Sequence, residues 1–118
     1  MHTLFRHCLT VLVFVTVFGA LAAVSASAAA PPSPDGKAVF AAQKCALCHS
    51  VQSAGIERTM KTSKGKDLST VGSERDAAWL TKWLKKQEML EGKPHQKAFT
   101  GTDPELTALV SWLGTLKK

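Results

Sequence analysis

The pattern of apolar and polar positions predicts three main helices. The clearest lies toward the C-terminus, where leucine and valine recur at the i, i+3, i+4, i+7 spacing of one helical face. Thr102 and Glu105 form a capping-box pair immediately before it, so we expect the helix to begin there. Its apolar face consists of Leu106, Leu109, Val110, Leu113 and Leu116.

Two shorter helices are expected upstream. Residues 35–44 are rich in Ala, with an acidic residue in the first turn and a lysine in the last, and this helix runs directly into Cys45. Ser73 is a good N-cap for a second helix that ends near residues 87–90. Its apolar residues are Trp79, Leu80, Trp83 and Leu84.

Long irregular segments separate these helices. Residues 51–72 and 91–101 contain many Gly, Pro, Ser and Thr residues and show no alternation typical of strands. We therefore predict an all-α fold with a middle helix between two terminal helices. Loops of this length are unusual in a small domain unless they wrap around something.

The first 28 residues have the pattern of a secretory signal peptide. A short basic head with Arg6 precedes an apolar run, and Ala26-Ser27-Ala28 fits the A-x-A cleavage rule, so we expect a cut near Ala28. The alternative is an uncleaved anchor, but the run is short for a bilayer span of about 20 residues. Residues 29–34 then form a flexible tail, and residues 35–118 form one domain.

Cleavage changes the composition that matters for function. It removes Arg6 and leaves 90 residues, in which 14 Lys and Arg stand against 9 Asp and Glu, a formal charge of +5. So small a domain often needs a metal, a disulfide or a cofactor for stability. The positive charge favours anionic partners, or electrostatic steering toward them.

The segment Cys45-Ala46-Leu47-Cys48-His49 carries the chemistry. A zinc site would need four ligands, and adjacent Cys48 and His49 make a tetrahedral set awkward. A thioredoxin-like redox pair needs a βαβ context, which the chain lacks. A disulfide between Cys45 and Cys48 would close a very small loop and would leave His49 without a role.

Covalent haem attachment explains all three residues, because C-x-x-C-H is its signature. Each thiol adds to one haem vinyl group, and two intervening residues let one helical turn span the two vinyl positions. The following histidine then lies over the iron as its proximal ligand. We therefore expect one haem c, attached through Cys45 and Cys48, with His49 bound to iron.

With this motif the chain resembles the class I c-type cytochromes over about residues 34–118. Gly36 and Phe40 resemble the family's N-terminal helix, and Thr102 to Leu116 its C-terminal helix. The resemblance implies that the two helices cross, with Phe40 against Leu109, Trp112 or Leu113. Residues 65–68, 71–72 and 79–80 resemble its mid-chain loop and middle helix.

One position departs from the family pattern. Lys66 stands where the family often has a proline whose carbonyl orients the proximal histidine. A backbone carbonyl needs no particular side chain, so Lys66 can serve in the same way.

The chain has no methionine at the position from which most class I cytochromes supply the sixth iron ligand. Most class I cytochromes use a methionine just before the C-terminal helix, where this chain has His95, four residues before Phe99. Imidazole is a good haem ligand, and Pro94 fixes the adjacent backbone. We predict His95 as the distal ligand and keep Met89 as the alternative; we interpret Met60 as a loop residue.

These features predict a periplasmic monohaem carrier of single electrons, monomeric and without catalytic residues, that binds acidic redox proteins rather than nucleic acid. The alternative is a haem-based sensor with an open or labile sixth site. After signal cleavage we expect no stable membrane insertion. The lysines expected to ring the haem edge are Lys37, Lys44, Lys61, Lys64, Lys93 and Lys97.

Overall fold

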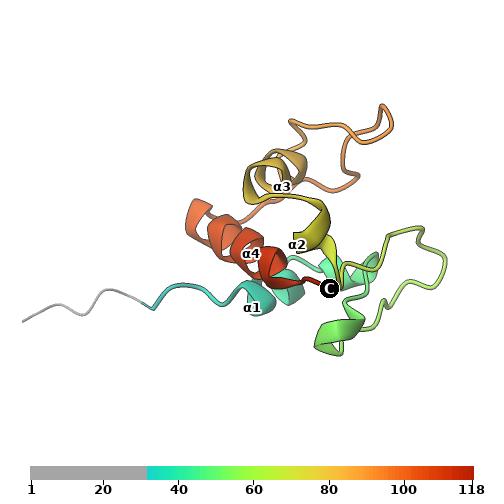
Figure 1. Ribbon diagram of the computed structural model, residues 1–118, viewed down its shortest axis with the longest axis horizontal. Coiled ribbons are helices and arrows are strands. Elements are labelled where there is room, and N and C mark those ends of the chain that lie inside the picture. Colours follow the sequence, from blue (N-terminus) through green and yellow to red (C-terminus); the bar gives the residue numbers. More distant parts are fainter. Residues whose placement is uncertain (1–31) are drawn as a thin grey trace, which may run out of the picture. The chain divides into compact units, whose positions relative to one another are not determined.

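The computed structural model describes residues 32–118, so the predicted signal peptide and residues 29–31 of the predicted tail lie outside the described residues (Figure 1). Residues 32–35 have no regular secondary structure. Within residues 32–118 the chain is helical and contains only two isolated β-bridges, with no strand. In this part of the chain, no helix has the length and apolar character needed to cross a membrane.

The elements follow one another with long connections, as the loop composition predicts. Two single 3₁₀ turns, η1 and η2, stand between the first and second α-helices. In chain order the elements are α1 (Gly36–Ala42), η1 (Cys45–Leu47), η2 (Gln52–Ala54), α2 (Val71–Glu74), α3 (Ala77–Leu84) and α4 (Asp103–Thr115).

Helices α1 and α4 cross in contact, and this crossing forms the centre of the domain (Figure 1). Phe40 packs edge-on against Trp112, with 5.3 Å between ring centroids, so the expected contact with Trp112 is confirmed. A Cβ at Gly36 would lie 2.2 Å from the carbonyl oxygen of Ala108. Only a residue without a side chain permits so close an approach of the two backbones.

The hydrophobic core surrounds this crossing. Phe40, Leu109 and Val51 are its fully buried large residues. All five residues of the predicted apolar face of α4 are buried, as its spacing predicts. Leu80 is the buried residue of α3, and Trp79 and Leu84 pack partly buried against the core.

The N-terminal boundary of α4 is the one that the sequence predicts. Thr102 is the N-cap, and the capping box with Glu105 is present in both directions. Two carboxylates in the first turn, Asp103 and Glu105, lie where the helix dipole favours negative charge.

The predicted extent of α1 was too long at both ends. Asp35 does not lie in the first turn but caps the helix, because its carboxylate accepts hydrogen bonds from the backbone N–H groups of Lys37 and Ala38. The helix ends at Ala42, and Lys44 has a left-handed φ of 57°. The chain therefore turns sharply before Cys45 instead of running straight into it.

The predicted start of the second long helix was also wrong. Ser73 lies inside the short helix α2, and the N-cap of α3 is Asp76, whose carboxylate accepts a 2.7 Å hydrogen bond from the N–H of Trp79. Both residues are good caps, and the extended backbone of Arg75 between them decides the choice. Helix α3 ends at Leu84, and Lys86 has a φ of 60°, outside the helical region.

Candidate cofactor site

A single turn arranges the two cysteines and the histidine. The N–H groups of Cys48 and His49 both donate to the carbonyl of Cys45, at 3.1 and 2.9 Å. The left-handed residue Lys44 starts this turn at an angle to α1. Both thiols are half-buried and not joined in a disulfide. Burial raises the pKa of the Cys45 thiol, an effect that Lys97 opposes.

The imidazole of His49 is fixed by the residue that the sequence singles out. Its Nδ1 lies 2.8 Å from the carbonyl oxygen of Lys66 and donates to it, which leaves Nε2 as the nitrogen available for a metal. Burial lowers the pKa of His49, partly offset by the bond to Lys66. The neutral imidazole, the form that binds metals, is therefore favoured.

The loop that supplies this carbonyl lies directly on the cysteine turn. A Cβ at Gly65 would lie 2.0 Å from the carbonyl oxygen of Cys48, so glycine allows the two backbones to meet. The Arg58 guanidinium donates a 2.8 Å hydrogen bond to the carbonyl of Gly65. The N–H of Leu68 donates to the carbonyl of Ser50 at 2.9 Å. Lys66 is thus held in place from both sides.

Asp67 ties the same loop to the segment after His49. Its carboxylate accepts hydrogen bonds from the hydroxyl of Ser50 at 2.7 Å and from the N–H groups of Ser69 at 2.9 Å and Gln52 at 3.2 Å. Hydrogen bonds from the Ser69 and Ser50 hydroxyls and these N–H groups hold the pKa of Asp67 far below its usual range. The carboxylate is therefore ionised at neutral pH.

The structure brings His95 to His49 across 46 residues of sequence. The two ring centroids are 6.0 Å apart and the ring planes differ by 14°. His95 Nδ1 donates to the carbonyl of Lys97, which leaves its Nε2 available, as in His49.

The loop around His95 is fastened at two helix ends. The N–H of Phe99 donates to the carbonyl of Leu84, at the end of α3, at 2.9 Å. The ammonium of Lys97 donates to the backbone carbonyl of Gln43, and the Thr100 hydroxyl donates to the Gln43 side chain at 3.1 Å. Because Gln43 is the C-cap of α1, the cation of Lys97 also lies at the negative end of that helix.

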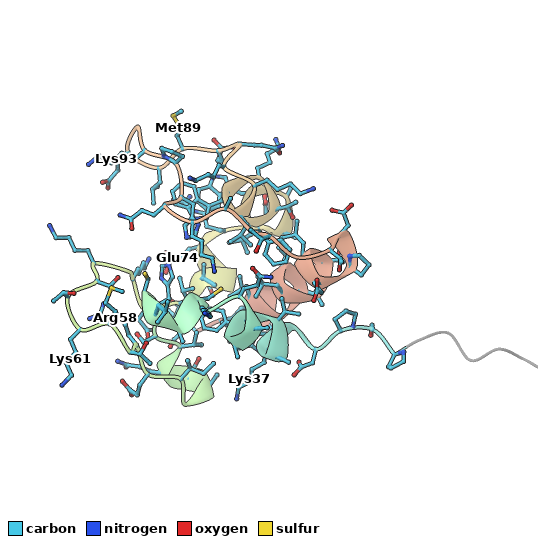
Figure 2. All side chains as sticks on the ribbon, turned by 180° about the vertical axis from the view of Figure 1, so that it is seen from behind. Lys37, Arg58, Lys61, Glu74, Met89 and Lys93 are labelled. Carbon is cyan, nitrogen blue, oxygen red and sulfur yellow. The ribbon has the colours of Figure 1, made fainter. Side chains whose placement is uncertain are left out.

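Unlike His95, the methionines Met60 and Met89 lie exposed in loops. Met89 is 64% exposed, on a loop that projects from the domain (Figure 2), and Met60 is 46% exposed. The structure thus gives His95, and not Met89, the place beside His49. It also leaves Met60 in a loop, as the sequence indicates.

These residues fit a haem. A metal held between two imidazole nitrogens at about 2 Å each places the ring centroids roughly 6 Å apart, which agrees with the spacing of His49 and His95. A cavity beside His95, far smaller than a porphyrin, has mainly apolar walls, so only the character of the surroundings of His95 suits a porphyrin face. Its lining includes Cys45, Leu84, His95, Ala98 and Phe99.

A zinc centre fits less well. In residues 32–118, no three side chains among His, Cys, Asp and Glu gather closely enough to hold a metal ion by themselves. Structural zinc needs four such ligands. A porphyrin supplies four nitrogens of its own, so two axial imidazoles are sufficient.

Sequence reasoning missed two supporting residues, Arg58 and Asp67. Arg58 belongs to no motif, and Asp67 lies in the family-like loop of residues 65–68 with no role predicted for its side chain; the partners that join separate segments are 7 to 17 residues away. The available signal was the pair Gly65 and Asp67 flanking Lys66, because glycine and aspartate mark tight, hydrogen-bonded loop turns.

Comparison with protein families matches residues 33–117 to the family described as Cytochrome c. The match spans almost all of the described chain and includes both cysteines, His49 and His95. No curated protein matched the chain, and no solved structure did.

Proposed function

Because the chain belongs to the cytochrome c family, whose members bind haem c covalently and transfer electrons, we propose that it is a periplasmic monohaem carrier of single electrons with His49 and His95 as axial ligands. The pairing of these imidazoles, 6.0 Å apart and nearly parallel, is the observation that carries the proposal. The cysteines of the attachment turn, Cys45 and Cys48, provide the two thiols.

The polypeptide positions the two ligands before any electron moves. Each Nδ1–H donates to a backbone carbonyl, that of Lys66 for His49 and that of Lys97 for His95. These bonds fix the tautomer and rotation of each ring and increase the basicity of Nε2. The haem supplies the one-electron iron couple, and no side chain has to transfer a proton.

The choice of His95 has a direct consequence for the reduction potential. Methionine with histidine raises the potential of a haem, and a second histidine in place of methionine lowers it. We therefore place the protein among low-potential carriers, compared with the small cytochromes that use methionine.

Electrostatics supports an acidic redox partner. The six lysines predicted to ring the haem edge are all exposed, and Lys61 and Lys93 extend from separate loops (Figure 2). Lys37 and Lys97 additionally donate to the backbone carbonyls of Ala54 and Gln43. The lysines best placed to move toward a partner's carboxylates are the other four: Lys44, Lys61, Lys64 and Lys93.

Export to the periplasm rests on the N-terminal pattern. The resemblance to c-type cytochromes implies haem attachment to the C-x-x-C-H motif by systems that work in the bacterial periplasm. This agrees with a signal peptide cut near Ala28. N-terminal sequencing of the haem-loaded protein tests this: a chain that starts near Ala29 supports export, and one that keeps Met1 contradicts cleavage.

The axial ligands are tested by the absorption spectrum of the ferric and ferrous protein, made with haem-attachment machinery. We expect a low-spin spectrum without the weak red methionine-to-iron band, unchanged in Met89→Leu. If the band is present in the wild type and is lost in Met89→Leu, the distal iron ligand is Met89 and not His95. A high-spin spectrum with immediate carbon monoxide binding would instead favour the sensor alternative.

A further inference from the structure

The imidazole of His95 packs against an aromatic side chain of α3. The ring of Trp83 lies 5.4 Å from that of His95, and the two planes are tilted by 60°. Both side chains are half-buried. Aromatic rings prefer tilted contacts, in which the edge of one ring approaches the face of the other, so such a contact favours one orientation of each ring. Trp83 thus restricts rotation of the His95 imidazole.

The two facing imidazoles are held in different ways. Nδ1 of His49 donates to the carbonyl of Lys66, 17 residues away in a separate loop. Nδ1 of His95 donates to the carbonyl of Lys97, which is two residues away in the same loop. The second bond fixes the His95 ring relative to its own loop and not relative to a helix. Trp83 supplies the contact with a helix, because it belongs to α3.

The loop of His95 is fastened on one side of this residue. The hydrogen bonds that join the loop to the ends of α1 and α3 come from residues 97–100, after His95. The residues before it belong to an exposed loop that projects from the domain (Figure 2). One of the fastening bonds joins Phe99 to the carbonyl of Leu84, the neighbour of Trp83 in α3. This bond keeps the loop in register with the end of α3 that carries Trp83.

The indole of Trp83 is itself supported. Trp79, one helical turn earlier, stacks on it with ring centroids 5.1 Å apart and planes 18° apart. The guanidinium carbon of Arg75 lies 4.5 Å from the centroid of the Trp79 ring. The carboxylate of Asp76 caps the helix at the N–H of Trp79. The stack restricts the Trp83 ring, so this ring can act as a fixed support for a neighbour.

We propose that Trp83, supported by Trp79, is a positioning residue that sets the plane of the His95 imidazole nearly parallel to that of His49, the two planes differing by 14°. This proposal rests on the proposed function, because the plane of the ring matters to the iron only if His95 binds it. Groups that orient an axial ligand tune the metal that it binds. Two parallel imidazoles direct their π electrons at the same iron d orbital, whereas crossed imidazoles act on two.

Electron paramagnetic resonance of the ferric, haem-loaded protein tests the role of Trp83. Trp83→Leu keeps an apolar side chain but removes the ring. We expect a highly anisotropic low-spin component to appear beside the rhombic signal. The fraction of molecules with crossed imidazole planes should rise about two- to tenfold, the factor that corresponds to the loss of one aromatic pair. Trp83→Phe keeps a ring beside His95 and should retain the rhombic signal of the wild type.

Trp112→Leu is the matched control. It also removes a half-buried indole, but Trp112 packs on Phe40 at the crossing of α1 and α4. An unchanged signal in Trp83→Leu, or an equal change in Trp112→Leu, would overturn the proposal. Trp79→Leu should change the signal in the same direction as Trp83→Leu, but less; no change there would overturn the supporting role of Trp79.

A measurement on the wild type keeps the proposal falsifiable if Trp83→Leu fails to fold. The ferrous low-spin protein is diamagnetic and suits nuclear magnetic resonance. We expect nuclear Overhauser contacts between the indole protons of Trp83 and the imidazole protons of His95. Absence of these contacts would overturn the proposal without any variant.

The signal of the wild-type ferric protein separates the failure of this proposal from that of the proposed function. A high-spin signal would contradict His49 and His95 as the axial pair, and with it the proposed carrier. A low-spin signal from two imidazoles, with planes that are crossed or that do not respond to Trp83→Leu, would overturn the role of Trp83 alone.

Discussion

At residue 95 the chain has an imidazole where the family pattern has a thioether, so a single substitution can test what this exchange does. We expect His95→Met to raise the reduction potential by on the order of 0.1 V, a modest part of the roughly 0.8 V range that axial ligands span. Redox titration followed by absorbance measures it. Met89→Leu serves as the control, and a shift in that variant with none in His95→Met would assign the iron to Met89.

Asp67 gives a second prediction, about stability. Its carboxylate accepts hydrogen bonds from Ser50 and Gln52, which join the Lys66 loop to the segment after His49, and one from Ser69 within that loop. Asp67→Asn places an amide N–H₂ group opposite one set of donors. We expect the free energy of unfolding at pH 7 to fall by about 1–2 kcal/mol, toward the low end because the site is partly exposed.

The pH dependence of this effect has a definite sign. The pKa of Asp67 is lower in the folded state than the unfolded value of about 3.9, so its contribution is full above that value and is lost as the pH falls below it. The difference in unfolding free energy between wild type and Asp67→Asn, measured by denaturant unfolding, should therefore stay constant from pH 7 down to about 4 and shrink as the pH falls further. Exposed Glu57→Gln is the control, and a difference that widens in acid would refute the assignment.

At the scale of elements, the close approach of α1 and α4 depends on Gly36. A Cβ there would lie 2.2 Å from the carbonyl oxygen of Ala108 and 2.4 Å from Cβ of Trp112. We expect Gly36→Ala to lower the free energy of unfolding by about 2–3 kcal/mol, because neither contact is with a flexible side-chain end.

Gly114 is the matched control for this substitution, because it lies in α4 and a Cβ there would meet nothing within 4 Å. Gly114→Ala should stabilise the protein by about 0.5–1 kcal/mol through helix propensity. Equal effects of the two substitutions in urea unfolding would show that the crossing does not depend on Gly36.

The elements that sequence could predict are those whose signals are local. The capping box of Thr102 and Glu105 and the apolar face of α4 lie within 15 residues, and the structure confirms both. The start of α3 could not be decided locally, since Ser73 and Asp76 are both good caps. The choice depends on α2, which packs against α4 through Gly72: a Cβ there would lie 2.4 Å from the Gly114 carbonyl.

The residues of the site likewise divide into those with a local sequence signal and those placed by contacts between distant segments. The attachment turn is a motif, so Cys45, Cys48 and His49 can be recognised from sequence alone. Arg58 and Asp67 act on His49 through the loop of Lys66, and contacts between two irregular segments leave no periodic trace in a sequence. The proximity of His95 to His49 is predicted by family position and is observed as ring geometry, but ligation itself remains a prediction.

At the scale of the whole molecule, the positive charge should control encounters. The chain outside the predicted signal carries a formal charge of +5, and surface charges act over a Debye length of about 10 Å at 0.1 M salt. We expect electron exchange with an anionic metal complex to slow several-fold between 0.01 and about 0.2 M salt, and exchange with a cationic complex to accelerate. Stopped-flow rates that do not change with salt concentration would contradict electrostatic steering by the positive charge.

The central claim, a haem held between His49 and His95, is tested most directly by electron paramagnetic resonance of the ferric protein. Two imidazoles with planes 14° apart predict a rhombic low-spin signal typical of nearly parallel axial imidazoles. A high-spin axial signal would show that His95 is not bound. A highly anisotropic low-spin signal would indicate crossed planes and would contradict the arrangement of the two rings described here.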